Sequence, residues 1–404
     1  MKEKVIVVGA GAIGLSIAYE LCQRGAQVTV VDRDQVFDSR ASSTSSSTYS
    51  GSAVATRRSA SSWAASGILP PANFDSATDP IDQLRGYSHR LFPRWADQLR
   101  QTTGIDCQLE RCGGWYLADT PGEIAAMMGM VNYWQELAIE CEAKSLAELA
   151  TKEPLLSPWA SSAKAKAWWV PDEYQIRTPS LLAALTAACQ ANGAELIGGA
   201  NVIDVDETGA STHVTIDHTG KRSKLIADAT VVCGGSWTGS VAARLKLSHS
   251  LIPIRGQILL LDMGHRQLSG VINFGNRYLV PRQNGSVLVG SCEEEVGHQH
   301  GTTPSILADL REFIRNVCPE LARATQITAW SGLRPMTFDG FPMIGKLPDS
   351  DAIYVASGHY RSGIHLAPAT AVCIADTIEG ATPPLSIQPF SVGKQQQQQQ
   401  TTAC

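Results

Sequence analysis

Residues 4–14 read KVIVVGAGAIG, and the order of residue types in this stretch decides the fold. Residues 4–8 form the β-branched run typical of a buried strand, and residues 12–23 have the apolar spacing of a helix. The glycines between them fit G-x-G-x-x-G, and a second strand at 28–32 ends in Asp32, 18 positions after Gly14. A lone glycine pattern is weak, but one that joins a strand to a helix and precedes such an acidic residue is specific. The stretch therefore predicts a βαβ unit that binds a dinucleotide.

Each residue of this motif is expected to have its own role. Gly9 makes the tight turn, Gly11 lets the backbone approach the pyrophosphate, and Gly14 permits close packing of the helix on the strand. The pyrophosphate then lies on the amides and the positive dipole end of the helix that begins at Ala12. Asp32 is expected to accept hydrogen bonds from the adenosine ribose hydroxyls.

Two later segments favour FAD over a nicotinamide cofactor. Residues 229–237 (ATVVCGGSW) form a strand that runs into a glycine turn, as in flavoproteins whose chain returns to the dinucleotide. Residues 353–378 contain a second such turn, in which His359, Tyr360 and Arg361 stand between two glycines before a helix of small residues. A flavin is held along its full length, so distant pieces of chain must converge on it. This convergence predicts FAD.

The composition limits the partners and the compartment. A net charge of −5 and a pI near 6.0 argue against nucleic acid or anionic membranes as main partners. No apolar run approaches the roughly 20 residues that a membrane-spanning helix needs. The ten cysteines include no C-x-x-C pair, which favours reduced thiols over disulfides and predicts no metal site. The first strand begins near Lys4 and leaves no room for a secretory signal, so a cytoplasmic protein without an integral membrane segment is expected.

The order of predicted elements indicates an α/β fold with two discontinuous domains. The first is a Rossmann-like FAD-binding domain of the glutathione-reductase type, made of residues 1–84, 170–245 and 325–390. The second is an α+β substrate domain on a largely antiparallel sheet, made of residues 85–169 and 246–324, since residues 251–292 alternate strongly as strands do. Residues 39–62 are rich in serine, which predicts a flexible insertion. Residues 391–404 include a run of glutamines, which predicts a disordered tail.

With these pieces placed, the chain resembles the D-amino-acid oxidase superfamily of FAD-dependent amine oxidoreductases, and within it the glycine oxidase (ThiO) type. The resemblance covers about residues 4–385, except for the serine-rich insertion. Besides the first glycine motif, it is carried by SSWAASGIL (61–69), VVCGGSW (231–237), IPIRGQ (252–257), YLVPR (278–282), VLVGS (287–291), GLRPMTFDGFPMIG (332–345) and SGHYRSGIHLAPATA (357–371). The last motif is the most specific of these.

The resemblance implies the site residues. The predicted cofactor contacts are Gly9, Gly11, Ala12, Ile13, Gly14, Asp32, Arg33, Ser61, Ser62, Ser66, Gly67, Ile68, Val202, His359, Tyr360, Arg361, Ser362, Gly363 and Ile364. Among them, Val202 matches a backbone position that holds the adenine, and residues 359–364 match a turn over the isoalloxazine ring. The predicted catalytic residues are Arg334, which matches the arginine that clamps the substrate carboxylate, and Tyr278 and Arg361, which match positions lining the pocket. No cysteine stands where some relatives attach their flavin, so noncovalent FAD is expected.

The chemistry of the side chains agrees with these roles. A guanidinium such as that of Arg334 is planar, permanently charged and able to bind a carboxylate with two hydrogen bonds. His359 could accept a proton, but hydride transfer from a neutral amine needs no strong base, so a structural role beside the flavin is predicted. Glu293 falls where some relatives have an apolar pocket residue, which leaves the side-chain selectivity open.

The implied activity is oxidative deamination of glycine, sarcosine or small D-amino acids by hydride transfer to FAD, with O2 reduced to H2O2 and a place in thiamine biosynthesis. Two alternatives stay open. The first is a D-amino-acid dehydrogenase that passes electrons to a quinone. The second is a flavoprotein partner without amine chemistry. A homo-oligomer is expected.

Overall fold

The computed structural model describes residues 3–35, 61–161, 164–241, 245–248, 250–265 and 267–393. The predicted insertion at 39–62 therefore lies outside the described residues, except for Ser61 and Ser62. Most of the predicted tail lies outside them as well. Val392, which the sequence analysis assigned to that tail, is 6% exposed and packs into a hydrophobic cluster of the fold.

The first sheet is the predicted dinucleotide-binding sheet. It has six strands in the order β19 (Met343–Lys346), β20 (Ile353–Ser357), β12 (Ala229–Val232), β1 (Lys4–Val8), β2 (Gln27–Asp32) and β8 (Glu195–Gly198). All neighbours are parallel except β19 and β20. Parallel strands buried on both faces read as continuous apolar runs, and this is why residues 4–8 and 229–232 lack polar alternation.

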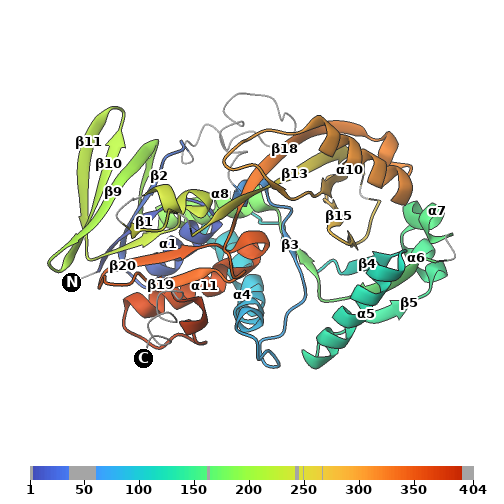
Figure 1. The fold of residues 1–404 in the computed structure, drawn as a ribbon, viewed down its shortest axis with the longest axis horizontal. Coiled ribbons are helices and arrows are strands. Elements are labelled where there is room, and N and C mark those ends of the chain that lie inside the picture. The colour runs from blue at the N-terminus through green and yellow to red at the C-terminus, as the bar shows by residue number, and fades with distance from the viewer. Residues whose placement is uncertain are drawn as a thin grey trace, which may run out of the picture.

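The two faces of this sheet are covered differently, as Figure 1 shows. Helices α1 (Ala12–Gln23), α4 (Pro80–Thr103), α8 (Thr178–Ala191) and α11 (Gly363–Ile378) pack on the face that carries Val5 and Val7. A three-stranded antiparallel sheet of β9 (Ala200–Thr208), β10 (Ser211–His218) and β11 (Lys221–Ala227) covers the face that carries Ile6 and Val8. The alternation of one strand thus builds two cores.

A second, nine-stranded sheet lies at the other end of the molecule (Figure 1). Its strands are β17 (Glu294–Glu295), β13 (Ile252–Asp262), β16 (Ser286–Gly290), β15 (Arg277–Pro281), β14 (Val271–Phe274), β4 (Gly114–Ala118), β6 (Lys166–Val170) and β5 (Glu142–Lys144), with β18 (Thr325–Met336) beside β13. Every pairing is antiparallel except that of β14 with β4. Helices α6 (Leu146–Lys152), α7 (Ser157–Ala160) and α10 (Pro304–Val317) pack on one face, while α5 (Pro121–Glu136) lies beside β4. The predicted fold class is confirmed.

One predicted boundary separates two strands that pair in the structure. The sequence analysis placed residues 325–390 in the FAD-binding domain, but β18 pairs with β13 along almost its whole length in the nine-stranded sheet. The long antiparallel pairing ties this strand to the other sheet. The remaining boundaries stay predictions.

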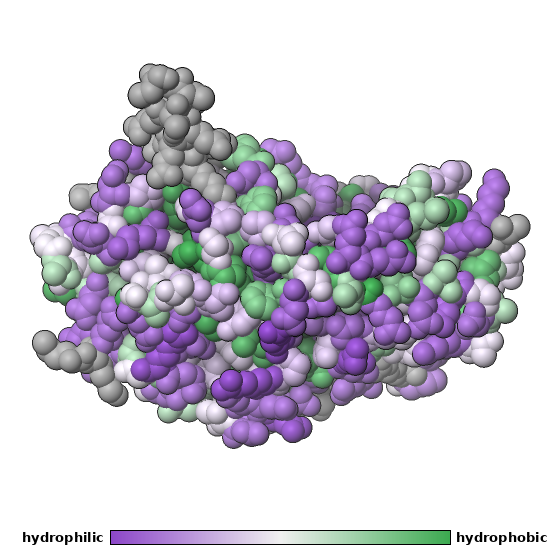
Figure 2. Space-filling view, turned by 90° about the horizontal axis from the view of Figure 1, so that it is seen from below, coloured by the Kyte–Doolittle hydropathy of each residue, from purple (hydrophilic) through white to green (hydrophobic). Residues whose placement is uncertain are grey.

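The surface gives one further observation. On the face shown in Figure 2, hydrophobic residues form small scattered areas among hydrophilic ones. Within the described ranges, no helix has both the length and the apolar character needed to cross a bilayer.

Candidate active site

A cavity of about 600 Å³ lies where the carboxyl ends of the parallel strands meet the β13–β18 pair. Its wall includes Val8 at the end of β1, Asp32 at the end of β2, Cys233 after β12 and Ser357 at the end of β20. The carboxyl ends of parallel strands are where open α/β sheets bind ligands. The predicted residues that line it are Gly9, Gly11, Ile13, Asp32, Arg33, Ser61, Ser62, Ser66, Ile68, Val202, Tyr278, Arg334, His359, Tyr360, Arg361, Ser362, Gly363 and Ile364.

The glycine turn at the start of α1 is shaped by backbone contacts. Gly9 has φ +108°, and a Cβ there would lie 2.4 Å from the carbonyl oxygen of Cys233. A Cβ on Gly14 would lie 1.9 Å from the carbonyl oxygen of Gly9. At Gly11 a Cβ would meet the Ser62 Oγ at 3.1 Å, and Gly11 itself lines the cavity. The outer two glycines therefore serve packing, and the middle one opens the helix end to a ligand.

Three predicted cofactor contacts lie behind the wall. Gly14 packs against Gly9, and the amide of Ala12 donates to the Ser62 Oγ at 2.9 Å. Gly67 has φ +73°, and a Cβ there would lie 2.0 Å from the Ile176 carbonyl oxygen. These residues hold the turn and the 61–68 loop in place beside the cavity.

The side chain of Asp32, the last residue of β2, is held by two backbone amides. Its carboxylate accepts hydrogen bonds from the amides of Ala10 (2.6 Å) and Asp34 (2.8 Å). Burial raises the pKa of Asp32, although these two donors lower it. Next to it, the guanidinium of Arg33 lies 3.9 Å from the ring centroid of Trp237, which comes from the segment after β12. This corner of the cavity suits the ribose and adenine end of a dinucleotide.

The turn before α11 brings a second helix end to the cavity. Gly358 has φ +83°, and a Cβ there would lie 2.5 Å from the Thr337 Cγ2. Ser362 precedes the helix without a side-chain cap, and both Ser362 and Gly363 line the cavity. The first amides of α11 are thus free to donate to an electron-rich ligand group. The helix ends at α1 and α11, whose own N-cap residues make no side-chain cap, fit the two polar regions of FAD, its pyrophosphate and its pyrimidine edge.

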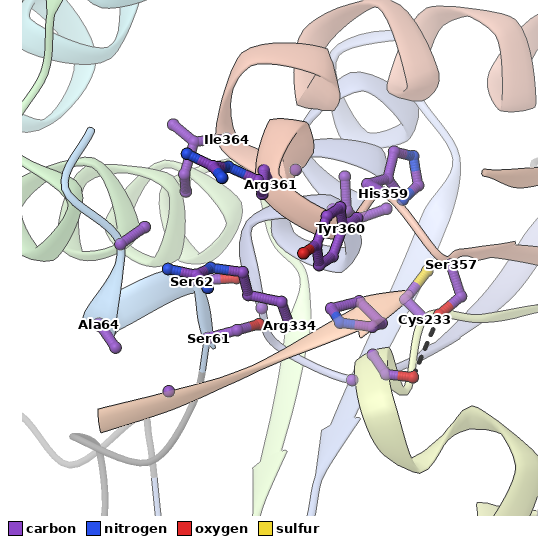
Figure 3. Close-up of a pocket in the computed structure, with 18 of the residues that line it drawn as sticks. Ser61, Ser62, Ala64, Cys233, Arg334, Ser357, His359, Tyr360, Arg361 and Ile364 are labelled. Carbon is purple, nitrogen blue, oxygen red and sulfur yellow. Dashed lines mark hydrogen bonds between the residues drawn. The ribbon is translucent and has the colours of Figure 1, made fainter. Parts of the chain in front are cut away.

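His359 is turned into the protein. Its Nε2 lies 3.0 Å from the Thr370 Oγ1, and burial lowers the pKa of His359 to about 3. In Figure 3 its ring lies on the opposite side of Tyr360 from the Arg361 guanidinium. A neutral imidazole held in this way cannot act as a base toward the cavity, and its placement suits a structural role.

Arg334 stands on β18 with its side chain at the cavity (Figure 3). Its Nη1 donates to the Cys292 carbonyl oxygen at 2.9 Å and its Nη2 to the Ser291 Oγ at 2.6 Å. A Cβ on Gly256 of β13 would lie 2.3 Å from the Arg334 Nη2. The missing side chain of Gly256 therefore makes room for the guanidinium.

Tyr278 on β15 also occupies space that the missing side chain of a glycine leaves open. It is 8% exposed, and a Cβ on Gly290 of β16 would lie 2.4 Å from its hydroxyl oxygen. Tyr278 and Arg334 line one cavity, and they lie against neighbouring residues, since the Tyr278 ring packs on Gly290 and the Arg334 Nη2 donates to Ser291.

Arg361 lies at the same side of the cavity but has an acidic partner. Its Nη1 donates to the Glu293 Oε1 at 2.7 Å, and both side chains are about two-fifths exposed. The hydroxyl of Tyr360 also hydrogen-bonds to Glu293. Sequence reasoning left Glu293 open, because nothing in the sequence shows which charge 68 residues away it meets.

Sequence reasoning missed the residues that hold the predicted ones. Gly256, Ser291 and Cys292 position Arg334, and Trp237 stacks with Arg33. Their motifs, IPIRGQ, VLVGS and VVCGGSW, were recognised as a resemblance, but their contacts cross between strands. For the residues around Arg334, the pairing of β13 with β18 and β16 would have been needed to find them.

Two histidines and an aspartate form a row behind the cavity wall that the sequence analysis did not predict. The Nε2 of His365, on the first turn of α11, lies 3.1 Å from the His89 Nδ1, and the His89 Nε2 lies 3.2 Å from an Asp172 carboxylate oxygen. Burial lowers the pKa of His365 well below its usual range. These two contacts join α4 to α11 and to Asp172.

Within the part of the chain that the structure describes, no group of three or more histidine, cysteine or acidic side chains is placed to hold a metal ion.

Comparisons with known proteins give one consistent result. The family model described as DAO, FAD dependent oxidoreductase, matches residues 4–377. A glycine oxidase of Geobacillus kaustophilus is 30% identical over 389 residues, which cover 96% of both chains. The bifunctional protein ThiO/ThiG of Trichormus variabilis is 28% identical over 419 residues, which cover 100% of this chain and 56% of that protein. The crystal structure of the G. kaustophilus glycine oxidase has a TM-score of 0.84 at 28% identity and covers 97% of this chain and 99% of that chain.

Proposed function

The chain belongs to the DAO family of FAD-dependent oxidoreductases, and we propose that within this family it oxidises glycine and other small amino acids, such as sarcosine and small D-amino acids. That it is an FAD-dependent amino-acid oxidoreductase follows from its family and its glycine oxidase relatives. The main support for an amino-acid substrate is that Arg334 and Tyr278 line the same cavity.

FAD supplies the hydride acceptor when it is bound. The residues of this chain that would hold it are those at the starts of α1 and α11, at Asp32 and Arg33, and on the 61–68 loop. The position after Arg334 is Pro335, which lacks a thiol, and the proposed binding is noncovalent.

Arg334 binds the substrate carboxylate in this proposal. Its guanidinium is already oriented by two neutral oxygens, and it has five N–H donors, so donors remain for a ligand. The Tyr278 hydroxyl donates to the same carboxylate. Together they hold the Cα of the amino acid in one orientation, which lowers the entropic part of the barrier. The buried apolar wall around Ile258 and Ile364 excludes water from the reacting atoms.

We further propose O2 as the electron acceptor, with H2O2 as product, and a role in thiamine biosynthesis like that of the ThiO type. The names glycine oxidase and ThiO among the relatives favour these roles. A D-amino-acid dehydrogenase that uses a quinone is the alternative on the same fold.

We also propose the two-domain division with one changed boundary. Residues 1–84, 170–245 and 337–390 form the FAD-binding domain, and residues 85–169 and 246–336 form the substrate domain. The membership of β18 in the nine-stranded sheet supports this change.

A two-stage flavin experiment tests the proposed function. The yellow protein is mixed anaerobically with glycine, sarcosine, D-alanine and D-proline, and the flavin absorbance is followed. Bleaching by at least one of them is expected, followed by rapid return of colour and release of peroxide when air is admitted. Bleaching with slow reoxidation in air would favour the quinone alternative. Failure of every amino acid to bleach the flavin would contradict amine oxidation.

A further inference from the structure

Glu293 lies in the short segment between β16 and β17, next to the residues that hold Arg334. Its carboxylate accepts hydrogen bonds from the Arg361 Nη1 and from the Tyr360 hydroxyl. Partial burial raises the pKa of Glu293, but the hydrogen bond of Tyr360 and the charges of Arg361 and Arg334 outweigh it and hold the pKa below its usual range. The carboxylate is therefore a fixed negative charge within reach of both guanidiniums.

The charges at this side of the cavity form a simple balance. Four arginines line the cavity, but the Arg33 guanidinium stacks on Trp237 and that of Arg277 on Phe313. The guanidiniums of Arg334 and Arg361 remain at this side, and both act on the Tyr360 hydroxyl. Figure 3 shows the two arginine side chains extending in the same direction, with Tyr360 beside them. Arg334 has neutral oxygens as partners, whereas Arg361 forms an ion pair with Glu293. One positive charge is thus left for a ligand.

We propose that Glu293 determines specificity by neutralising Arg361, so that the site accepts amino acids with a single carboxylate and disfavours those with a second acidic group. The proposal rests on the proposed function, since it assigns the remaining charge to the substrate carboxylate. It names the substrate class as monocarboxylic amino acids.

Two physical effects act together in this selection. A second carboxylate placed near Arg361 meets the like charge of Glu293, which costs binding energy. It also finds the donors of Arg361 already used. Because both side chains of the pair are partly exposed, solvent screens these charges, and an effect of about tenfold is expected rather than an absolute exclusion.

Replacing Glu293 with glutamine isolates the charge. Glutamine keeps the length of the side chain and an oxygen that accepts from Tyr360, but it no longer repels an anion or neutralises Arg361. The matched control is Glu295→Gln, which changes the net charge equally at an exposed position of the same acidic run. The double variant E293Q/R361Q removes the charge that Glu293→Gln releases.

Ligand binding measures the effect without turnover. FAD-loaded protein is titrated with acetate and with malonate, succinate and glutarate, and dissociation constants are read from the perturbed flavin absorbance. For Glu293→Gln we expect at least one diacid to bind at least tenfold more tightly, while the acetate constant stays within threefold. The gain should be absent in Glu295→Gln and lost in the double variant.

Other outcomes separate the two proposals. If Glu293→Gln binds acetate but gains no more for any diacid than Glu295→Gln does, the assignment of Glu293 is wrong and the carboxylate site stands. A gain that persists in the double variant would equally overturn it, since Arg361 would not be the released partner. If the wild-type protein binds acetate but no amino acid reduces its flavin, the proposed function is wrong, while the role of Glu293 in selecting monocarboxylates still stands. If it binds no acetate, both fail.

Discussion

At the scale of single residues, the site depends on side chains whose charge is set by their immediate neighbours. Arg334 keeps its charge available because its partners, the Ser291 hydroxyl and the Cys292 carbonyl, are neutral. Arg361 has a carboxylate partner, and His359 is neutral because it is buried. The same residue types in other surroundings would have other roles, so each assignment is testable by changing one group.

Arg334→Lys tests the carboxylate clamp. Lysine keeps the charge but loses the planar fork that binds with two hydrogen bonds. A hydrogen bond to a charged group is worth about 1.5–3 kcal/mol, which is about 10- to 100-fold in binding. We therefore expect KM for glycine or sarcosine to rise by about that factor, with FAD affinity unchanged. Steady-state kinetics and flavin titration measure the two quantities, and an unaltered KM would remove Arg334 from the substrate site.

His359→Asn tests the buried imidazole through pH. The unfolded chain protonates this group below about pH 6.5, but the folded protein does so only near its pKa of about 3. The stability from neutral burial is therefore full above pH 6.5 and falls as the pH drops toward 3. Between pH 7.5 and 5.5 the wild type should lose about 1.4 kcal/mol more than the variant. Urea unfolding at both pH values measures this difference, and equal losses would show that folding does not lower the pKa of His359.

A difference between variants is needed because other groups titrate in the same range. Burial raises the pKa of Glu173 to about 7, so its contribution has the opposite sign and is lost as the pH rises above the unfolded value. His365 adds a contribution of the same sign as His359. Both are common to the wild type and the variant and cancel.

At the scale of elements, the register of β13 with β18 positions the substrate arginine. Gly256 pairs with Gly332, and Arg334 pairs with Ile254 two positions along, so Gly256 and Arg334 are diagonal neighbours on one face. A slip by one residue would turn Arg334 to the other face of the sheet. The glycine and the arginine therefore function as one unit, although they are 78 positions apart (334 − 256).

Gly256→Ala tests this unit. The added Cβ would lie 2.3 Å from the Arg334 Nη2, the flexible end of the side chain, so the guanidinium should move while the strands stay paired. We expect a roughly tenfold rise in KM, equivalent to about 1.4 kcal/mol, with a nearly unchanged melting temperature.

The matched control is Gly129→Ala in α5, where a Cβ would meet open space. It should leave KM unchanged and stabilise the helix by up to about 1 kcal/mol. A large loss of stability in Gly256→Ala would instead mean that the glycine serves backbone packing.

At the scale of the whole molecule, the cavity is where separate parts of the chain converge. Its wall draws on β1, β2, the 61–70 segment, β9, the turn after β12, the β13–β18 pair and the start of α11. A ligand that fills it binds the folded chain and not the unfolded one, so it stabilises the fold by mass action.

Removal of FAD should therefore lower the melting temperature, and added FAD should raise it progressively with concentration. At a free concentration 1,000 times the dissociation constant the gain is about 4 kcal/mol. Riboflavin, which lacks the pyrophosphate and adenosine, should restore less because it makes no contacts with the α1 end and Asp32. Thermal melts across both titrations check this, and equal rescue by riboflavin would contradict the assignment of the glycine turn.

Much of this architecture is readable from local patterns. The helix predicted at 12–23 has exactly those ends in the structure, because the glycines start it and its apolar spacing is helical. The parallel strands at 4–8 and 229–232 were readable as apolar runs. The pairing of β18 with β13 was not readable, since a strand pattern does not say which sheet the strand joins.

The site divides in the same way. Residues of the glycine turns were predictable because a short motif contains the whole reason for them. The ion pair of Glu293 with Arg361, the row from His365 to Asp172 and the space left by Gly290 were not, because each joins residues distant in the chain. Such contacts arise from sheet register and helix packing, which single-sequence patterns do not contain.

The position of β20 has a consequence for biosynthesis. This strand lies between β12 and β19, and the helix that follows it provides the last part of the cavity wall, up to His365. During synthesis, the segments up to His365 must therefore all emerge before the cofactor has its complete site. Until β20 emerges, the edge of β12 that β20 will cover is unpaired, and it can pair wrongly or bind chaperones. Because FAD finds its complete site only after these segments have emerged, cofactor added after synthesis should still raise the share of folded protein.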